Sequence, residues 1–423
     1  MEHKIVTLKN GLRVALVPLR DAKTATVLLM VGTGSRYENK RENGLAHFLE
    51  HMFFKGTKRR PTARAICTEL DGIGGAYNAF TAKNRTAYYA KVSKEHVETA
   101  LDVVSDIFLN STLPTREINK ERGAIIQEIN MYEDMPMRSV GDVFETLLFG
   151  AEHSLGRTIL GPKENIRSFA RDDFISYLKR CYTAANTVVC VAGAFPAEKV
   201  LAKIKREFAH VPTGVNPSCS TYTSDHTVAR IKIKHKKTDQ TQLVLGVPSY
   251  RFEHKDEHAL DVLTTILGIG MSSRLFTEVR ERRGLAYFIR ASVEKFADTG
   301  YLAVQAGVEH DKLHKTIETI IRELRKIKRE RVASAELKKA KEHLKGSLSL
   351  SLETSEDLAG YVATSLTLLG KVHTLEDTKS RIDAVTAGDI QRVARDIFKT
   401  ERLNLAVIGP HTEEKQLLSL LRV

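Results

Sequence analysis

The chain has 423 residues, of which 42% are hydrophobic, and its formal net charge is +13. This length exceeds what one hydrophobic core normally fills, so two or more domains are expected. No stretch approaches the roughly 20 apolar residues of a membrane-spanning helix, so no membrane partner is expected.

The positive charge is spread along the chain and is not accompanied by a nucleic-acid motif. Its densest run, from Arg322 to Arg331, alternates with apolar residues, as on a solvated helix face. We therefore expect no nucleic-acid partner.

Cysteine usage and the first residues bear on the cellular compartment. The four cysteines form no Cys-x-x-Cys pair, and residues 1–5 lack the basic and apolar segments of a secretion signal. These features predict a cytoplasmic protein with reduced thiols and no disulfide frame.

The first half of the chain predicts strands interleaved with helices. Apolar runs or alternation predict strands at residues 4–18, 24–32, 86–92 and 187–197. Apolar residues at helical spacing predict a helix over residues 95–110. A second helix is expected to follow Pro114, because proline favours the first helical turn.

A short motif in this half has the pattern of a metal site. Residues 47–51 are His-Phe-Leu-Glu-His. Residues four apart share one helix face, so His47 and His51 can bind one metal ion. Glu50 reaches the same face, where a carboxylate beside a metal-bound water can act as general base. The order His-x-x-Glu-His is typical of inverzincins, although two chance histidines on a packed helix would give the same letters.

A third ligand is expected on the helix after Pro114, since zinc in a hydrolytic site usually takes three protein ligands and leaves one position to water. Glu121 and Glu128 are two turns apart and point the same way. One can bind the metal while the other orients a ligand histidine; a solvated acidic face is the alternative. Gly123 in this helix costs about 1 kcal/mol relative to alanine, which predicts close approach of another backbone.

With the His-x-x-Glu-His motif and the two helix glutamates, the sequence resembles the pitrilysin/insulinase family of zinc peptidases over nearly its whole length. The resemblance is closest to the small two-domain bacterial branch that is similar to the mitochondrial processing peptidase β subunit. Other matching stretches are residues 74–81, 132–136, 153–156 followed by Gly161, 272–276 and 283–287. The resemblance implies that His47, His51 and Glu128 bind one Zn²⁺ per chain, that Glu50 is the catalytic base, and that Glu121 supports a ligand histidine.

The second half repeats the order of elements from about Thr227. Its strands are expected at residues 231–234 and 242–247, and its first helix at residues 257–267. Aligned with the first half, it has no matching ligand set: the residues opposite the motif and the two helix glutamates are Asp261, Thr264, Thr265, Ala340 and Ser347. The second copy thus keeps the apolar frame and lacks the metal ligands.

We therefore predict an α+β fold of two homologous sheet-plus-helices domains from an internal duplication. The catalytic domain is expected at residues 1–212 and the C-terminal domain at 227–423. Residues 213–226, rich in Pro, Gly, Ser, Asn and Thr, are expected to be the linker.

Two further sets of residues are candidates for substrate contact. Arg280 and Tyr287 have the spacing of an arginine and a tyrosine that contact the substrate near the scissile bond in the family. A guanidinium and a phenol are suitable donors to a carbonyl that becomes an oxyanion; a surface arginine and a half-buried tyrosine are the alternative. Residues 78–80, which are Asn78, Ala79 and Phe80, resemble the edge strand along which the family's substrates lie.

The resemblance implies a zinc-dependent endopeptidase acting on unfolded peptides or presequence-like segments. The family's long members carry four such domains, with zinc in the first and the arginine and tyrosine in the last. A two-domain chain then implies a homodimer, in which a second copy supplies Arg280 and Tyr287 and closes a chamber. The alternative is a non-catalytic core or scaffold subunit, although such relatives lose part of the ligand set.

Overall fold

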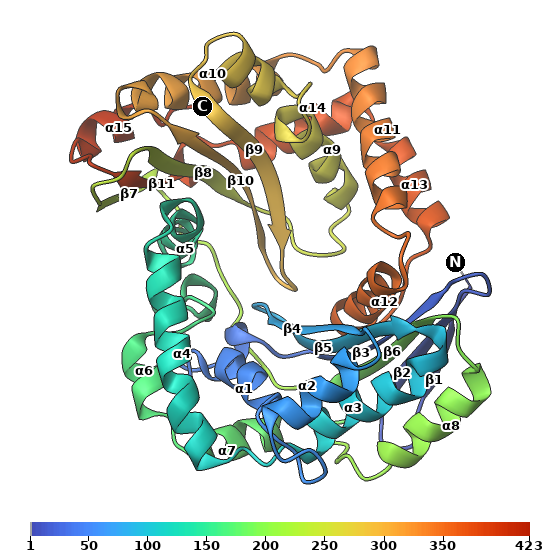
Figure 1. Ribbon diagram of the computed structural model, residues 1–423. Coiled ribbons are helices and arrows are strands. Elements are labelled where there is room, and N and C mark those ends of the chain that lie inside the picture. Colours follow the sequence, from blue (N-terminus) through green and yellow to red (C-terminus); the bar gives the residue numbers. More distant parts are fainter. Residues whose placement is uncertain (1) are drawn as a thin grey trace. The chain divides into compact units, whose positions relative to one another are not determined.

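The computed structural model describes residues 2–423, which form two compact units (Figure 1). The first unit runs to Ile129 and also includes Arg157–Ser220 and Ser349–Thr374. The second unit comprises Asn130–Gly156, Thr221–Leu348 and Leu375–Val423. Each unit therefore draws on both halves of the sequence.

The first unit is built on a six-stranded sheet in the order β1-β2-β6-β3-β5-β4. Its strands are β1 (Lys4–Thr7), β2 (Arg13–Pro18), β3 (Thr24–Val31), β4 (Ala76–Thr81), β5 (Thr86–Ser93) and β6 (Thr187–Gly193). Only β2 and β6 run parallel. The strand predicted over residues 4–18 is two strands, because Gly11, at a φ of 90°, makes a turn between them.

Helices cover both faces of this sheet. They are α1 (Leu45–Phe53), α2 (Ala63–Asp71), α3 (Val97–Asn110), α4 (Thr115–Glu133), α6 (Lys163–Ser168), α7 (Arg171–Cys181), α8 (Ala197–Glu207) and α12 (Ser355–Leu369). Along β3, Val27 and Leu29 belong to the core that contains α1 and α3, while Leu28 and Met30 pack with α12. Cover on both faces explains why the strands are continuous apolar runs.

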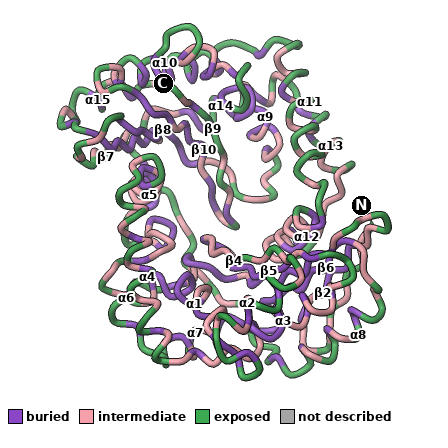
Figure 2. Tube along the Cα trace, in the orientation of Figure 1, coloured by how far each residue is buried: buried purple, intermediate pink, exposed green. Residues whose placement is uncertain are grey.

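The second unit is built on a five-stranded sheet in the order β7-β11-β8-β10-β9. Its strands are β7 (Arg230–His235), β8 (Thr241–Ser249), β9 (Ala286–Lys295), β10 (Gly300–Val308) and β11 (Asn404–Gly409). Its helices are α5 (Pro136–Phe149), α9 (Glu257–Gly268), α10 (Leu313–Arg329), α11 (Ser334–Leu350), α13 (Leu375–Ala384), α14 (Ala387–Ile397) and α15 (Glu414–Leu420). The strand order repeats that of β2 to β4 in the first sheet, with β4 and β9 at equivalent edges. Figure 2 shows buried residues along the strands of each sheet.

The two units exchange one helix each. Helix α12, from the second half of the sequence, packs on the first sheet through Leu358, Val362 and Leu366. Helix α5, from the first half, packs on the second sheet through Val140 and Phe144. The sequence contained no sign of this exchange, and the domain ranges 1–212 and 227–423 stay a prediction.

The predicted fold class is confirmed, since both units are mixed sheets covered by helices. The expectation for Gly123 was wrong: this residue is exposed on α4, and a Cβ built there meets nothing within 4 Å. Within residues 2–423, no helix is long and apolar enough to cross a membrane.

Candidate metal centre

Helix α1, which holds the His-x-x-Glu-His motif, is fixed by its core face and by an unusual N-terminal cap. Leu45, Phe48, Leu49 and Met52 are buried in the first core. The N-cap residue is a glycine, whose missing side chain is replaced by the carboxylate of Glu38. That carboxylate accepts hydrogen bonds from the backbone N–H groups of residues 44 and 46, at 2.9 and 2.6 Å. Glu38 thus satisfies the free donors at the start of the helix.

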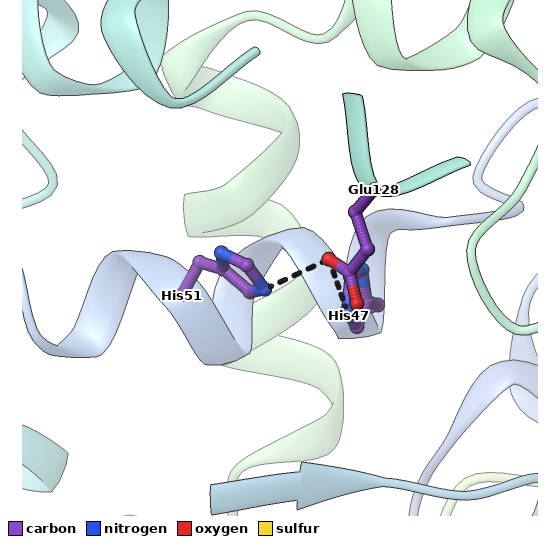
Figure 3. A group of neighbouring side chains, drawn as sticks. All are labelled: His47, His51 and Glu128. Carbon is purple, nitrogen blue, oxygen red and sulfur yellow. Dashed lines mark ion pairs between the residues drawn. The ribbon is translucent and has the colours of Figure 1, made fainter. Parts of the chain in front are cut away.

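Three side chains converge on one point from α1 and α4 (Figure 3). The Nε2 atoms of His47 and His51 each lie 3.5 Å from Oε2 of Glu128. Ligand atoms on a tetrahedral zinc ion stand about 3.4 Å apart, given bonds of about 2.0 to 2.2 Å. The three donors, two imidazoles and a carboxylate, are also a common zinc ligand set. Within residues 2–423, this is the one cluster of three or more histidine, cysteine, aspartate or glutamate side chains found that could hold a metal ion.

The protonation of the two histidines differs. Burial, with the neighbouring His51, lowers the pKa of His47 to about 3, so this imidazole is neutral and ready to bind a metal. Burial alone would also lower the pKa of His51, but the hydrogen bond and charge of Glu121 outweigh it and raise that pKa. A metal ion binding to His51 must therefore displace a proton at acidic pH.

Glu121 contacts the Nδ1 atom of His51 and is itself paired with Lys55. The Nδ1 atom of His51 lies 2.8 Å from Oε1 of Glu121, and Lys55 Nζ lies 2.6 Å from the other oxygen of the same carboxylate. Burial would raise the pKa of Glu121, but the hydrogen bonds from His51 and Lys55 outweigh it and lower that pKa. An ionised Glu121 keeps the proton of His51 on Nδ1 and leaves Nε2 free toward Glu128.

Glu50 sits beside the three converging side chains without joining them. Its Oε2 accepts a hydrogen bond of 2.5 Å from the hydroxyl of Thr81, the last residue of β4. Burial and, to a smaller extent, the charge of Glu128 raise the pKa of Glu50. The Thr81 hydrogen bond and the charge of His51 lower it, and the net shift is upward. A partly buried carboxylate with a raised pKa is suited to taking up a proton.

The other candidates lie on the two edge strands β4 and β9, except Arg280, which is in the short helical segment Phe276–Glu281 before β9. Asn78, Ala79 and Phe80 are in β4, whose outer edge is unpaired in the first sheet. In the second unit, Arg280 lies with its guanidinium 5.0 Å from the ring centre of Tyr287. Tyr287, near the start of the edge strand β9, is 76% exposed. The two side chains are thus in mutual contact, with Tyr287 open to solvent and Arg280 half-buried.

Sequence reasoning missed three residues of this site: Glu38, Lys55 and Thr81. Lys55 lies after the end of α1 at Phe53, so the helical spacing that connects His47 and His51 does not reach it. Glu38 precedes the helix at no standard capping position. Thr81 is 31 residues from Glu50, and no local pattern connects them.

Comparison with known proteins bears on the family of this chain. Residues 13–163 match the family model described as Insulinase (Peptidase family M16), and residues 168–344 match the Peptidase M16 inactive domain. An uncharacterised zinc protease of Bacillus subtilis is 38% identical over 408 residues, covering 96% of this chain and 98% of that protein. A probable mitochondrial-processing peptidase subunit beta of Arabidopsis thaliana is 34% identical, covering 97% of this chain and 78% of that protein.

Solved structures agree as well. The crystal structure of a protease from Helicobacter pylori superimposes with a TM-score of 0.89 at 27% identity, over 97% of this chain and 99% of that one. The two family models cover most of the chain in the expected order, and the Bacillus relative matches nearly all of it. The chain therefore belongs to peptidase family M16, the insulinase family.

Proposed function

We propose that this protein is a zinc-dependent endopeptidase that cuts unfolded peptides or presequence-like segments. The observation that carries the proposal is the convergence of His47, His51 and Glu128, whose ligand atoms lie within 4.8 Å of one another beside Glu50. Relatives named as zinc proteases and as a processing-peptidase subunit support it.

The chemistry divides among the side chains. When bound by His47, His51 and Glu128, zinc would act as a Lewis acid that polarises the peptide carbonyl and lowers the pKa of water. Glu50 takes a proton from the attacking water and delivers it to the leaving amine. Glu121, held by Lys55, keeps His51 in one orientation.

The substrate is proposed to lie along β4. Along Asn78, Ala79 and Phe80 the free edge of this strand offers the backbone N–H and C=O groups of alternate residues, so an extended peptide can pair with it largely regardless of its side chains. A folded protein has no free extended segment to offer. Selection for unfolded chains follows from this mode of binding.

The test is digestion of matched substrates by the metal-loaded protein. We expect a mixture of unfolded peptides to be cut and a stable folded protein of similar composition to survive, and a chelator should stop all cleavage. Cleavage that persists in chelator, or equal cleavage of both substrates, would contradict the proposal. Bound metal without any cleavage would favour the alternative, a non-catalytic scaffold subunit.

We further propose that the enzyme is a homodimer in which Arg280 and Tyr287 of one copy act at the metal centre of the other. The basis is that Arg280 contacts the ring of Tyr287, which is exposed, in the unit that does not hold the three converging side chains. Both side chains can donate hydrogen bonds to a carbonyl oxygen that gains charge.

Mixed dimers test this sharing. Glu50→Gln and Tyr287→Phe chains should each be inactive alone, yet after subunit exchange one of the two sites has both groups intact. Activity should return to about half of wild type for each mixed dimer. Mixed dimers confirmed by mass that stay inactive would place the pair in the same chain as its zinc site.

A further inference from the structure

The hydrogen bond between Thr81 and Glu50 joins the proposed base to the strand proposed to bind the peptide. Thr81 Oγ1 lies 2.5 Å from Glu50 Oε2, which is in the range of a charge-assisted O–H···O⁻ bond. A carboxylate can only accept, so the hydroxyl is the donor. Oε1 of Glu50 makes no hydrogen bond within residues 2–423.

The backbone around Thr81 is held in place by hydrogen bonds. It is the last residue of β4 and faces Thr86 across the β4–β5 pair. The turn that follows is pinned by backbone hydrogen bonds from Ser35 N to Ala82 O, at 3.2 Å, and from Arg36 N to Lys83 O, at 2.9 Å. Threonine is also branched at Cβ, which restricts its first side-chain torsion. The hydroxyl therefore stands at a defined position.

The carboxylate of Glu50 has no such restraint of its own. The terminal torsion of a glutamate is broad and roughly two-fold, so an unheld carboxylate samples many orientations. A proton acceptor must lie within about 2.6 to 3.2 Å of the group that it deprotonates. One donor on Oε2 is enough to fix the plane and to leave Oε1 free.

We propose that Thr81 is a positioning residue, whose hydroxyl holds Glu50 through Oε2 so that Oε1 faces the water that it deprotonates. This inference rests on the proposed function. It also connects binding to chemistry: a peptide that pairs with β4 lies on the strand whose last residue orients the base. Peptide binding and base orientation then share one rigid element.

The experiment compares three variants of the zinc-loaded full chain. Thr81→Val removes the hydroxyl and keeps the shape, and it should lower kcat about tenfold or more with KM and metal content unchanged. Thr81→Ser restores the donor and should recover kcat to within about threefold of wild type. Thr86→Val is the matched control: it removes a buried hydroxyl from the facing residue, which bonds Thr33 O at 2.9 Å, and it should keep wild-type kcat.

A structural readout accompanies the kinetics. Crystal structures of the wild type and of Thr81→Val should show the Glu50 carboxylate in one orientation and in several, respectively. Wild-type kcat in Thr81→Val, equal loss in Thr81→Ser, or equal loss in Thr86→Val would each overturn the inference. If the wild type cuts no peptide at all, the proposed function fails, and an unchanged Glu50 orientation in Thr81→Val would still overturn the positioning role by itself.

Discussion

Replacing Glu50 with glutamine is expected to lower kcat for peptide cleavage by about a hundredfold or more while the metal stays bound. Glutamine has the same shape, and its carbonyl oxygen can still accept the Thr81 hydrogen bond. The amide cannot take up the proton of the attacking water, so only the transfer step is lost. Glu50 is not among the three converging ligands, so metal content should not change.

The measurement is kcat and KM on an unfolded peptide, with metal analysis of the same samples. Glu117→Gln is the matched control, because this half-buried glutamate on α4 pairs with Lys120 and with no other charged side chain of residues 2–423. We expect it to behave as wild type. Near-normal turnover by Glu50→Gln would remove Glu50 from the role of base, and loss of metal in that variant would make it a ligand.

Replacing His51 with alanine is expected to remove nearly all bound metal, from a starting content of about one ion per chain. The loss should be large because His51 is one of the three side chains proposed to bind the metal, and its removal also leaves Glu121 without its imidazole partner. Metal content after dialysis is the measurement.

A graded series sharpens this test. Glu121→Gln keeps all three ligands and loses the charge that holds His51 Nδ1, so it should weaken metal affinity by about 10- to 100-fold. Glu117→Gln should leave affinity unchanged. Full metal occupancy in His51→Ala, or identical affinities for the two glutamate variants, would contradict this account of the site.

Sequence patterns were sufficient for the parts of the site that follow helix geometry. The four-residue spacing of His47 and His51 places both on one face of their helix, and the two-turn spacing of Glu121 and Glu128 does the same on theirs. The patterns left open which glutamate faces the histidines. The structure has Glu128 at their Nε2 atoms and Glu121 on Nδ1 of His51, because of how α4 crosses α1.

Contacts that join distant segments were not predictable from one sequence. Glu38 caps α1 from a loop, and the Thr81 hydroxyl reaches Glu50 from a strand edge. Both depend on tertiary folding and leave no periodic signal. The inference from Gly123 failed for a related reason, since a glycine in a helix can face solvent as well as a neighbour.

The exchange of α5 and α12 has a consequence for how such a chain could arise. The two helices occupy corresponding places in the two halves, directly after α4 and α11. Dividing the sequence at residue 220 would strip one apolar face from each sheet, which is an aggregation hazard. A chain of half this length would therefore need this helix from a second copy of itself. In the full-length chain, the contact that would otherwise join two molecules lies within one.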